Sequence, residues 1–173
     1  DGGFVEIATT RPETLFGDQA IAIHPENAKL KHLIGKKAII PLTDIEIPII
    51  ADEHADPEKG TGAVKITPAH DFDDYEVGLR HNLKPLCILT PDAKLNDESV
   101  IPEKYHGMDR YVARKEIVAD IESAGLMVKI EDKIIPTPYS ERGGVPVEPM
   151  LTTQWFVDAK TLAEPAIKAV EAG

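Results

Sequence analysis

The residues best suited to chemistry lie between Gly60 and Gly78, in the stretch GTGAVKITPAHDFDDYEVG. Four carboxylates fall within six positions there, at Asp71, Asp73, Asp74 and Glu76. Asp71 and Asp74 are three residues apart, so they share a face if a helix begins here. Free backbone N–H groups and the helix dipole stabilise negative charge in that first turn. The pair can therefore cap a helix, or it can present anions to cationic or hydrogen-bond-donating groups of a small substrate.

A second polar set directly precedes the acidic stretch. Gly60, Thr61 and Gly62 form a segment in which the backbone can turn tightly or approach a ligand closely. Lys65 and Thr67 alternate with apolar residues, so both should project from the same face of a strand. We expect that face to bring an ammonium and a hydroxyl beside the start of the acidic helix.

A further polar cluster occurs upstream, in ATTRPETLFG, and consists of Thr9, Thr10, Arg11 and Thr14. A structural explanation is a strand end followed by a helical turn with Pro12 at its first position. That explanation accounts for Pro12 but gives no reason for Arg11. We therefore keep the cluster as a candidate part of the same site.

Other catalytic arrangements have weaker support. A metal-dependent hydrolase could use His54, His70 and Asp71, but their spacing matches no zinc-site motif, so we expect no metal. The sequence contains no nucleophile elbow, phosphate-binding loop or dinucleotide fingerprint, and none of its serines has a base partner in a known motif. An enzyme built on this chain would use water as its nucleophile and no cofactor.

Composition narrows the function classes. The chain has 173 residues, which favours one domain with a sizeable core, and a formal net charge of −11. Such acidity argues against a module that grips the body of a nucleic acid, because phosphate contacts need lysine and arginine. It does not exclude contact with one end of a nucleic acid.

Three features bear on the setting of the chain. No apolar run approaches about 18 residues, so we expect no membrane span. The single cysteine, Cys87, excludes an internal disulfide and fits a reducing, cytoplasmic environment. The chain starts without methionine and stops inside a helical pattern, which we interpret as a piece of a longer protein.

The elements that must position the polar residues are short strands and a few helices. Strands are predicted where β-branched or alternating runs are bounded by Gly, Pro or Asp: residues 4–8, 20–23, 37–40, 45–50, 63–66, 126–131 and 145–157. Helices are predicted near 71–82 and 109–123. Many short strands without strand–helix–strand alternation favour a mixed α/β fold, with a β-barrel core of short strands and peripheral helices.

At TTRPETLFGD and GTGAVKITPAHDFDDYEVG the sequence resembles the editing (CP1) domain inserted into class I valyl-tRNA synthetases. The resemblance continues through IADEHADPEKGTG and ERGGVPVEPMLTTQWFV and so covers nearly the whole chain. The segments KITPAHDFDDYEVG and EPMLTTQWFV together distinguish this type from its leucyl and isoleucyl relatives, which share the pattern in outline only.

The resemblance implies an activity: hydrolysis of threonine wrongly esterified to the 3′-terminal ribose of valine tRNA. It implies that Asp74 holds the α-ammonium group, and that Asp71, Lys65 and Thr67 surround the threonine hydroxyl. Arg11 and Thr14 would orient the terminal adenosine or the ester. Further binding groups would come from the threonine-rich segment and the GTG turn, namely Thr9, Thr10, Gly60, Thr61 and Gly62.

The resemblance also implies how the chain is organised. Residues 1–157 would form the editing domain, and residues 158–173 would begin the segment that returns to the parent synthetase. The partners would be that parent, which joins valine to tRNA with ATP, and the 3′ end of aminoacylated valine tRNA. Because an insertion leaves and rejoins its host, both chain ends are expected on one side of the domain.

Two alternatives remain open at this point. The same polar residues could serve a non-catalytic domain that binds a small ligand or the 3′ end of a tRNA. The chain could also be the equivalent editing domain of an isoleucyl or leucyl synthetase.

Overall fold

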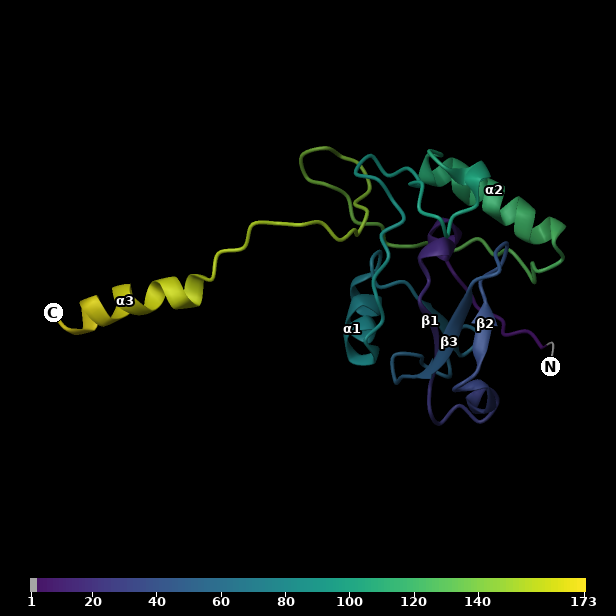
Figure 1. Ribbon diagram of the computed structural model, residues 1–173, viewed down its shortest axis with the longest axis horizontal. Helices are drawn as coiled ribbons and strands as arrows, with labels where there is room; N and C mark the ends of the chain where they lie inside the picture. Colours follow the sequence, from purple (N-terminus) through teal and green to yellow (C-terminus); the bar gives the residue numbers. More distant parts are fainter. Residues whose placement is uncertain (1–2) are drawn as a thin grey trace.

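The computed structural model describes residues 3–173 (Figure 1). The elements are the 3-10 helices η1 (Pro12–Gly17), η2 (Lys31–Leu33) and η3 (Glu103–Tyr105), the strands β1 (Ala20–Ile23), β2 (Lys37–Ile39), β3 (Glu46–Ala51) and β4 (Ala63–Ile66), and the α-helices α1 (Phe72–His81), α2 (Arg110–Ser123) and α3 (Ala159–Glu171). The predicted mixed α/β class is confirmed.

The four strands form one sheet in the order β2-β3-β1-β4. β1 pairs in parallel with β3 and antiparallel with β4, with Ile21 opposite Lys65. The sheet is open among residues 3–173, with β2 and β4 at its edges, so the strands do not close the expected barrel. The antiparallel β1–β4 pair matters most for function, because it places the residues before β1 beside those after β4.

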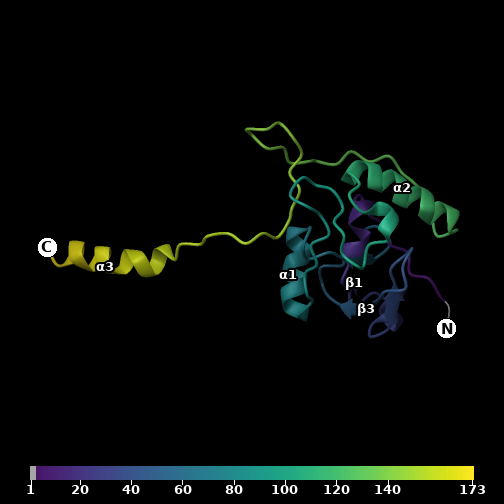
Figure 2. The ribbon, with the colours of Figure 1, turned by 45° about the horizontal axis from the view of Figure 1, so that its top comes forward.

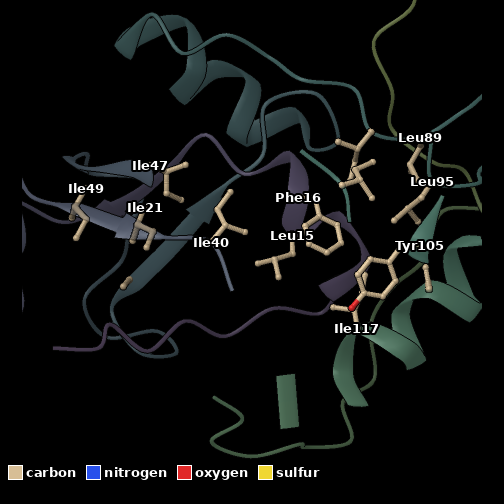
Figure 3. Packing of buried hydrophobic residues seen from close by; sticks show 14 of the residues in the cluster. Leu15, Phe16, Ile21, Ile40, Ile47, Ile49, Leu89, Leu95, Tyr105 and Ile117 are labelled. Carbon is tan, nitrogen blue, oxygen red and sulfur yellow. The ribbon is translucent and has the colours of Figure 1, made fainter. Parts of the chain in front are cut away.

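Alternation along β1 supplies both faces of the sheet with core residues. Ile21 and Ile23 pack into the larger hydrophobic cluster, together with Phe16 from η1 and Tyr105 from η3 (Figure 3). Ala20 and Ala22 face the smaller cluster, where Val77 of α1 packs. Small side chains on this face let α1 lie close to the sheet, and the start of α1 is thereby held beside the end of β4.

The helices α1 and α2 each begin after an aspartate that caps the first turn, and α1 ends at an asparagine. Asp71 caps α1 by accepting hydrogen bonds from the backbone N–H groups of Asp73 and Asp74, at 2.9 and 3.1 Å. Asn82 ends α1 in the left-handed conformation, at φ 54°. Asp109 caps α2, which packs against η1.

Three predicted strands are wrong. Residues 4–8, 126–131 and 145–157 carry alternating apolar residues but are not strands in the part of the chain that is described. Many of their apolar side chains face solvent: Phe4, Val128 and Ile130 are 88%, 67% and 69% exposed, whereas Val5 and Ile7 pack partly against the larger hydrophobic cluster. Alternation predicts a strand only where a sheet edge is available to pair with it, and none of these segments lies along one.

The end of the chain extends away from residues 3–150, which we call the body. An extended segment leads from about residue 151 to α3, which has no buried residue and lies far from the sheet in both views (Figures 1 and 2). The start of the described chain and its end therefore lie at opposite extremes, and the expectation that the ends share one side is wrong for this chain. Within residues 3–173, none of the helices combines the length and apolar character needed to cross a bilayer.

Candidate active site

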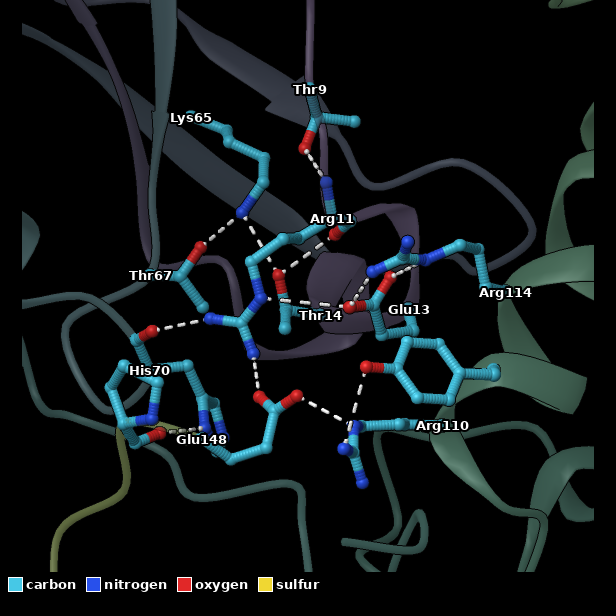
Figure 4. A network of polar contacts seen from close by, with 12 residues as sticks. Thr9, Arg11, Glu13, Thr14, Lys65, Thr67, His70, Arg110, Arg114 and Glu148 are labelled. Carbon is cyan, nitrogen blue, oxygen red and sulfur yellow. Dashed lines mark hydrogen bonds and ion pairs between the residues drawn. The ribbon is translucent and has the colours of Figure 1, made fainter. Parts of the chain in front are cut away.

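Polar residues from three segments meet where β4, η1 and the start of α1 approach one another. Figure 4 shows Lys65, Thr67 and Thr14 of this group. Lys65 lies on β4 and Thr67 follows it, so both project to one side as their alternation predicts. Thr14 comes from η1, and Asp74 comes from the first turn of α1. The structure therefore brings together four of the predicted site residues from separate parts of the sequence.

Lys65 is the centre of this cluster. Its ammonium group donates to Thr14 Oγ1 at 3.2 Å and to Asp18 Oδ1 at 3.0 Å, and it also contacts Thr67 Oγ1. The side chain of Lys65 is 11% exposed, and Thr14 and Thr67 are each 1% exposed. A charged group this deeply buried needs partners, because water cannot solvate it.

Asp18 belongs to the cluster and was not predicted. It lies between η1 and β1, is 2% exposed, and accepts a 2.5 Å hydrogen bond from Thr67 Oγ1 as well as the bond from Lys65. Burial raises the pKa of Asp18, and the neighbouring Lys65 ammonium opposes that rise. The residue stands at the end of the quoted segment TTRPETLFGD, but its partners are 47 and 49 positions away.

Asp74 is a buried carboxylate at the edge of the cluster, 6% exposed. Its Oδ2 accepts a 2.8 Å hydrogen bond from the backbone N–H of Thr67, and its Oδ1 lies 3.6 Å from His54 Nε2. Burial raises the pKa of Asp74 to about 6, despite the bond from Thr67, and the nearby Asp71 adds to the rise. An incoming cation would relieve this unfavourable burial, so Asp74 is suited to hold an ammonium group.

Asp71 has a different position. It is exposed, and its Oδ1 accepts both capping bonds of α1. The structural role considered for it in the sequence is therefore present. Its second carboxylate oxygen has no hydrogen bond among the described residues, so capping does not use the whole group.

Arg11 ties the site to distant parts of the chain. It donates to the His70 carbonyl at 2.6 Å, forms an ion pair with Glu148, and lies 3.5 Å from Glu13. Glu13 is fully buried and receives two bonds from Arg114 of α2, at 2.7 and 2.8 Å. In this arrangement the guanidinium of Arg11 is largely occupied by the protein.

The threonine-rich segment contributes unequally. Thr14 Oγ1 donates to the Arg11 carbonyl at 3.0 Å, and Thr9 Oγ1 accepts from the Arg11 N–H at 3.0 Å. Thr10 is exposed and is not part of this hydrogen-bonded network. Only Thr14 of these threonines lies inside the buried cluster.

The GTG turn has the backbone conformation that its glycines predict. Gly60 and Gly62 have φ values of 57° and 76°, in the left-handed region that favours glycine. A Cβ at Gly62 would lie 2.6 Å from Asn27 Nδ2, and a Cβ at Gly60 would lie 3.9 Å from that of Ala8. The Thr61 hydroxyl bonds within the turn, to the Ala63 carbonyl at 3.2 Å. The turn thus lies beside the segment that leads into the threonine-rich cluster.

The geometry weakens the alternative of a metal site at His54, His70 and Asp71. The ring of His70 is 1% exposed, accepts at Nε2 from the Ile88 N–H at 2.9 Å, and has Nδ1 3.1 Å from the Pro149 carbonyl. Burial lowers its pKa to about 4, so the ring is neutral near pH 7. Both ring nitrogens are engaged by backbone groups, and neither is available to a metal.

The cluster offers two buried carboxylates, a buried ammonium and two hydroxyls within a small volume. Such a set can hold a substrate that carries an ammonium group and a hydroxyl. The side chains include no activated nucleophile, so a hydrolysis performed here would use water.

Comparison with known proteins bears on the family. The family model described as "Leucyl-tRNA synthetase, editing domain" matches residues 28–134. A valine–tRNA ligase of Francisella tularensis is 58% identical over 96% of this chain, and one of Caulobacter vibrioides is 54% identical over 98%. The chain spans 18% of the length of each of these relatives.

A solved structure supports the fold independently. "The crystal structure of GlLeuRS-CP1" superposes with a TM-score of 0.55 at 15% identity, covering 72% of this chain and 82% of that one. The chain therefore belongs to the family of aminoacyl-tRNA synthetase editing domains, and its resemblance to the editing domain of class I valyl-tRNA synthetases is confirmed.

Proposed function

We propose that this chain performs post-transfer editing for a valine–tRNA ligase by hydrolysing threonyl-tRNA(Val). The ester between threonine and the 3′-terminal ribose is cleaved by water, which releases threonine and leaves the tRNA free to be charged again. The domain is an aminoacyl-tRNA deacylase in this proposal.

The need for such a step follows from the similarity of the two amino acids. Threonine and valine have nearly the same shape and differ by a hydroxyl in place of a methyl. Valine-specific synthetases are the standard example of the resulting problem, since a hydrophobic site rejects the added hydroxyl only about 10²-fold. A second, polar site is required to recognise the hydroxyl directly.

The observation that carries the proposal is the buried group of Lys65, Thr67 and Thr14 with the Asp74 carboxylate beside it. A threonine hydroxyl can exchange hydrogen bonds with this group, whereas a valine methyl would leave buried polar atoms without partners. Each buried donor or acceptor left unpaired costs about 1–3 kcal/mol. Discrimination then comes from polarity rather than from size.

Each predicted residue has a role in this proposal. Asp74 holds the α-ammonium of the aminoacyl group, and Lys65 and Thr67 meet the threonine hydroxyl. Asp71 contributes through the carboxylate oxygen that does not cap α1. Backbone N–H groups of the GTG turn or the threonine-rich segment stabilise the oxyanion that forms when water attacks the carbonyl.

Arg11 and Thr14 orient the ester or the terminal adenosine in the proposal, with Thr9 and Thr10 at the rim. Arg11 can do so by exchanging its bond to Glu148 for a substrate group, or by holding the Glu148 segment in place. The first of these routes requires the segment to move.

The proposal also covers the domain boundaries of the chain and its partners. Residues 1–157 form the editing domain, and residues 158–173 begin the return to the rest of the synthetase, which joins valine to tRNA. The domain contacts the 3′ end of the aminoacylated tRNA, which is compatible with the net charge of −11. The cytoplasmic location expected from the single cysteine stays a prediction.

The direct test is hydrolysis of preformed threonyl-tRNA(Val) by the full-length protein, measured against the spontaneous rate and against valyl-tRNA(Val). The proposal predicts faster loss of threonine than of valine, unchanged by a chelator. Retention of the aminoacylated 3′ end without hydrolysis would indicate a binding domain instead. Loss of activity with chelator would indicate the metal-dependent hydrolase.

A further inference from the structure

We propose that Asp18 is a positioning residue for discrimination: it holds the Thr67 hydroxyl proton and anchors the Lys65 ammonium, so that Thr67 meets the substrate only as an acceptor. This inference rests on the proposed function and deepens it. Asp18 does not touch the substrate, and it acts through the two side chains that do.

The first support is the way Asp18 is held. Its Oδ1 receives both the 2.5 Å bond from Thr67 Oγ1 and the 3.0 Å bond from Lys65 Nζ, and the residue is 2% exposed. Burial opposes ionisation of Asp18, but two donors on one oxygen, one of them the Lys65 ammonium, favour the carboxylate form. An ionised carboxylate only accepts hydrogen bonds, so the proton between Thr67 and Asp18 comes from Thr67.

The second support is the number of protons that Lys65 can offer. An ammonium group has three N–H donors. In this structure they are directed to Asp18 Oδ1, Thr14 Oγ1 and Thr67 Oγ1. The bond to Thr14 is the longest of the three, at 3.2 Å, so this donor is the one most easily redirected to a ligand.

The hydrogen bonds of the Thr14 and Thr67 hydroxyls can be counted in the same way. A hydroxyl has one proton and two lone pairs. Thr67 gives its proton to Asp18 and accepts from Lys65, and Thr14 gives its proton to the Arg11 carbonyl and accepts from Lys65. Each threonine is left with one lone pair and no proton.

A substrate hydroxyl is therefore met by one redirected donor, from Lys65, and by an acceptor, at Thr67. A hydroxyl satisfies both, because it accepts one bond and donates another. A methyl group satisfies neither. Without Asp18 the Thr67 proton is free to turn toward the ligand, and Lys65 loses its buried counter-charge.

The test compares Asp18→Asn with wild type in the full-length protein, using the ratio of deacylation rates for threonyl- and valyl-tRNA(Val). Asparagine keeps the shape and removes the charge. The ratio is expected to fall by about tenfold, the effect of losing one oriented hydrogen bond. The melting temperature of each variant is measured alongside.

The chain offers a matched control. Asp120 Oδ2 also accepts from a lysine and a hydroxyl, Lys104 and Tyr105, but this trio lies outside the site. Asp120→Asn should therefore leave the ratio unchanged. An equal fall in both variants would show a general effect of losing a carboxylate that pairs with a lysine and a hydroxyl, and would overturn the proposal.

A double-mutant cycle distinguishes positioning from an independent effect. If Asp18 acts through Thr67, Asp18→Asn should lower the ratio little further in a Thr67→Val background. Additive losses would contradict this route. An unchanged ratio in Asp18→Asn on its own would also overturn the proposal.

A measurement on the unmodified protein applies even if Asp18→Asn fails to fold. The Thr67 hydroxyl proton, buried and bonded to a carboxylate, should be visible by NMR as a slowly exchanging resonance. Rapid exchange of this proton would contradict the assignment. Absence of any wild-type hydrolysis of threonyl-tRNA(Val) is a separate result, which refutes the proposed function and the inference with it.

Discussion

Among single residues, the site depends on two carboxylates that are buried away from water, where the charged form is unfavourable. Asp74 and Asp18 are both nearly inaccessible to water, at 6% and 2% exposure, and burial raises the pKa of each. Groups of this kind are common where a protein must bind a cation or direct a proton. Asp18 is already paired with Lys65, whereas Asp74 has only the His54 ring within ion-pair distance among residues 3–173.

The raised pKa of Asp74 predicts a pH dependence of editing. Asp74 holds an ammonium only when ionised, so kcat/KM for threonyl-tRNA should rise through about pH 6 and level off above it. The measurement is the rate above the spontaneous rate between pH 5 and pH 8. Asp74→Asn should lose this rise, while His54→Gln, which removes the neighbouring ring, should keep it. A flat wild-type profile would contradict the role of Asp74.

The same group predicts a cost in stability. Its pKa is about 6 in the folded protein and about 3.8 in the unfolded chain, so the folded state binds the proton more tightly. The contribution of Asp74 to stability is therefore most favourable below about pH 4 and is lost as the pH rises through about 6. Asp74→Asn should raise the melting temperature at pH 8 relative to wild type, and the gain should vanish near pH 4. A lower melting temperature at pH 8 would show that the charge is well compensated.

At the scale of elements, the site is set by how α1 lies on the end of β4. Gly78 faces Pro68, and a Cβ there would lie 3.0 Å from two carbons of the proline ring. The contact lets the helix approach closely, and it keeps Asp74 within 2.8 Å of the Thr67 N–H. The missing side chain at Gly78 is therefore part of how the site is positioned.

Gly78→Ala tests this arrangement. Alanine favours helix by about 1 kcal/mol over glycine, but overpacking against a rigid ring costs about 1–3 kcal/mol. We expect a lower melting temperature and slower threonyl-tRNA deacylation, because α1 must shift away from β4. Glu76→Ala, an exposed change on the same helix, should affect neither quantity. A Gly78→Ala variant that is more stable and fully active would show that the close approach is unimportant.

What the sequence could predict was local. The alternation of Lys65 and Thr67, the capping position of Asp71 and the four strands of the sheet are encoded within a few residues of each other, and all are present. The contacts of Asp18 could not be predicted from the sequence, because its partners lie on β4 and just beyond it. Only the β1–β4 register, with Ile21 opposite Lys65, brings them together.

Longer-range features were predicted less well for the same reason. The contact between Arg11 and Glu148 spans 137 positions, and no local pattern indicates it. The strands predicted at 126–131 and 145–157 have the right alternation, but these segments do not pair with either edge strand of the sheet. Their exposed apolar side chains, including Trp155 and Phe156, have no covering partner within residues 3–173.

In the molecule as a whole, the final helix α3 does not pack on the body and has no buried residue. The last residues that form polar contacts with the rest of the body are Glu148 and Pro149. Glu148 pairs with Arg11 and with Arg110 at 2.6 Å, and the Pro149 carbonyl lies beside the His70 ring. From residue 151 onward the side chains are exposed, and α3 contains Pro165 in its interior. A helix of this length with an internal proline has little stability of its own.

Truncation tests where the domain ends. Residues 1–157 should melt within about 1 °C of the whole chain, because α3 contributes no buried surface. Residues 1–146, which lack Glu148 and Pro149, should melt several degrees lower, since each kcal/mol lost corresponds to about 2–4 °C at this size. A large loss of stability in the longer truncation would show that α3 packs on the body in solution.

The most direct test of the central claim uses Asp74→Ala in the full-length synthetase, with two activities measured on the same preparation. Asp74 is the proposed holder of the substrate ammonium, and losing a charge-assisted bond costs about 1.5–3 kcal/mol or more. The account predicts that hydrolysis of threonyl-tRNA(Val) falls by at least about tenfold, while activation of valine is unchanged. If threonyl-tRNA(Val) were hydrolysed as fast by Asp74→Ala as by wild type, the assignment of this cluster as the editing site would be wrong.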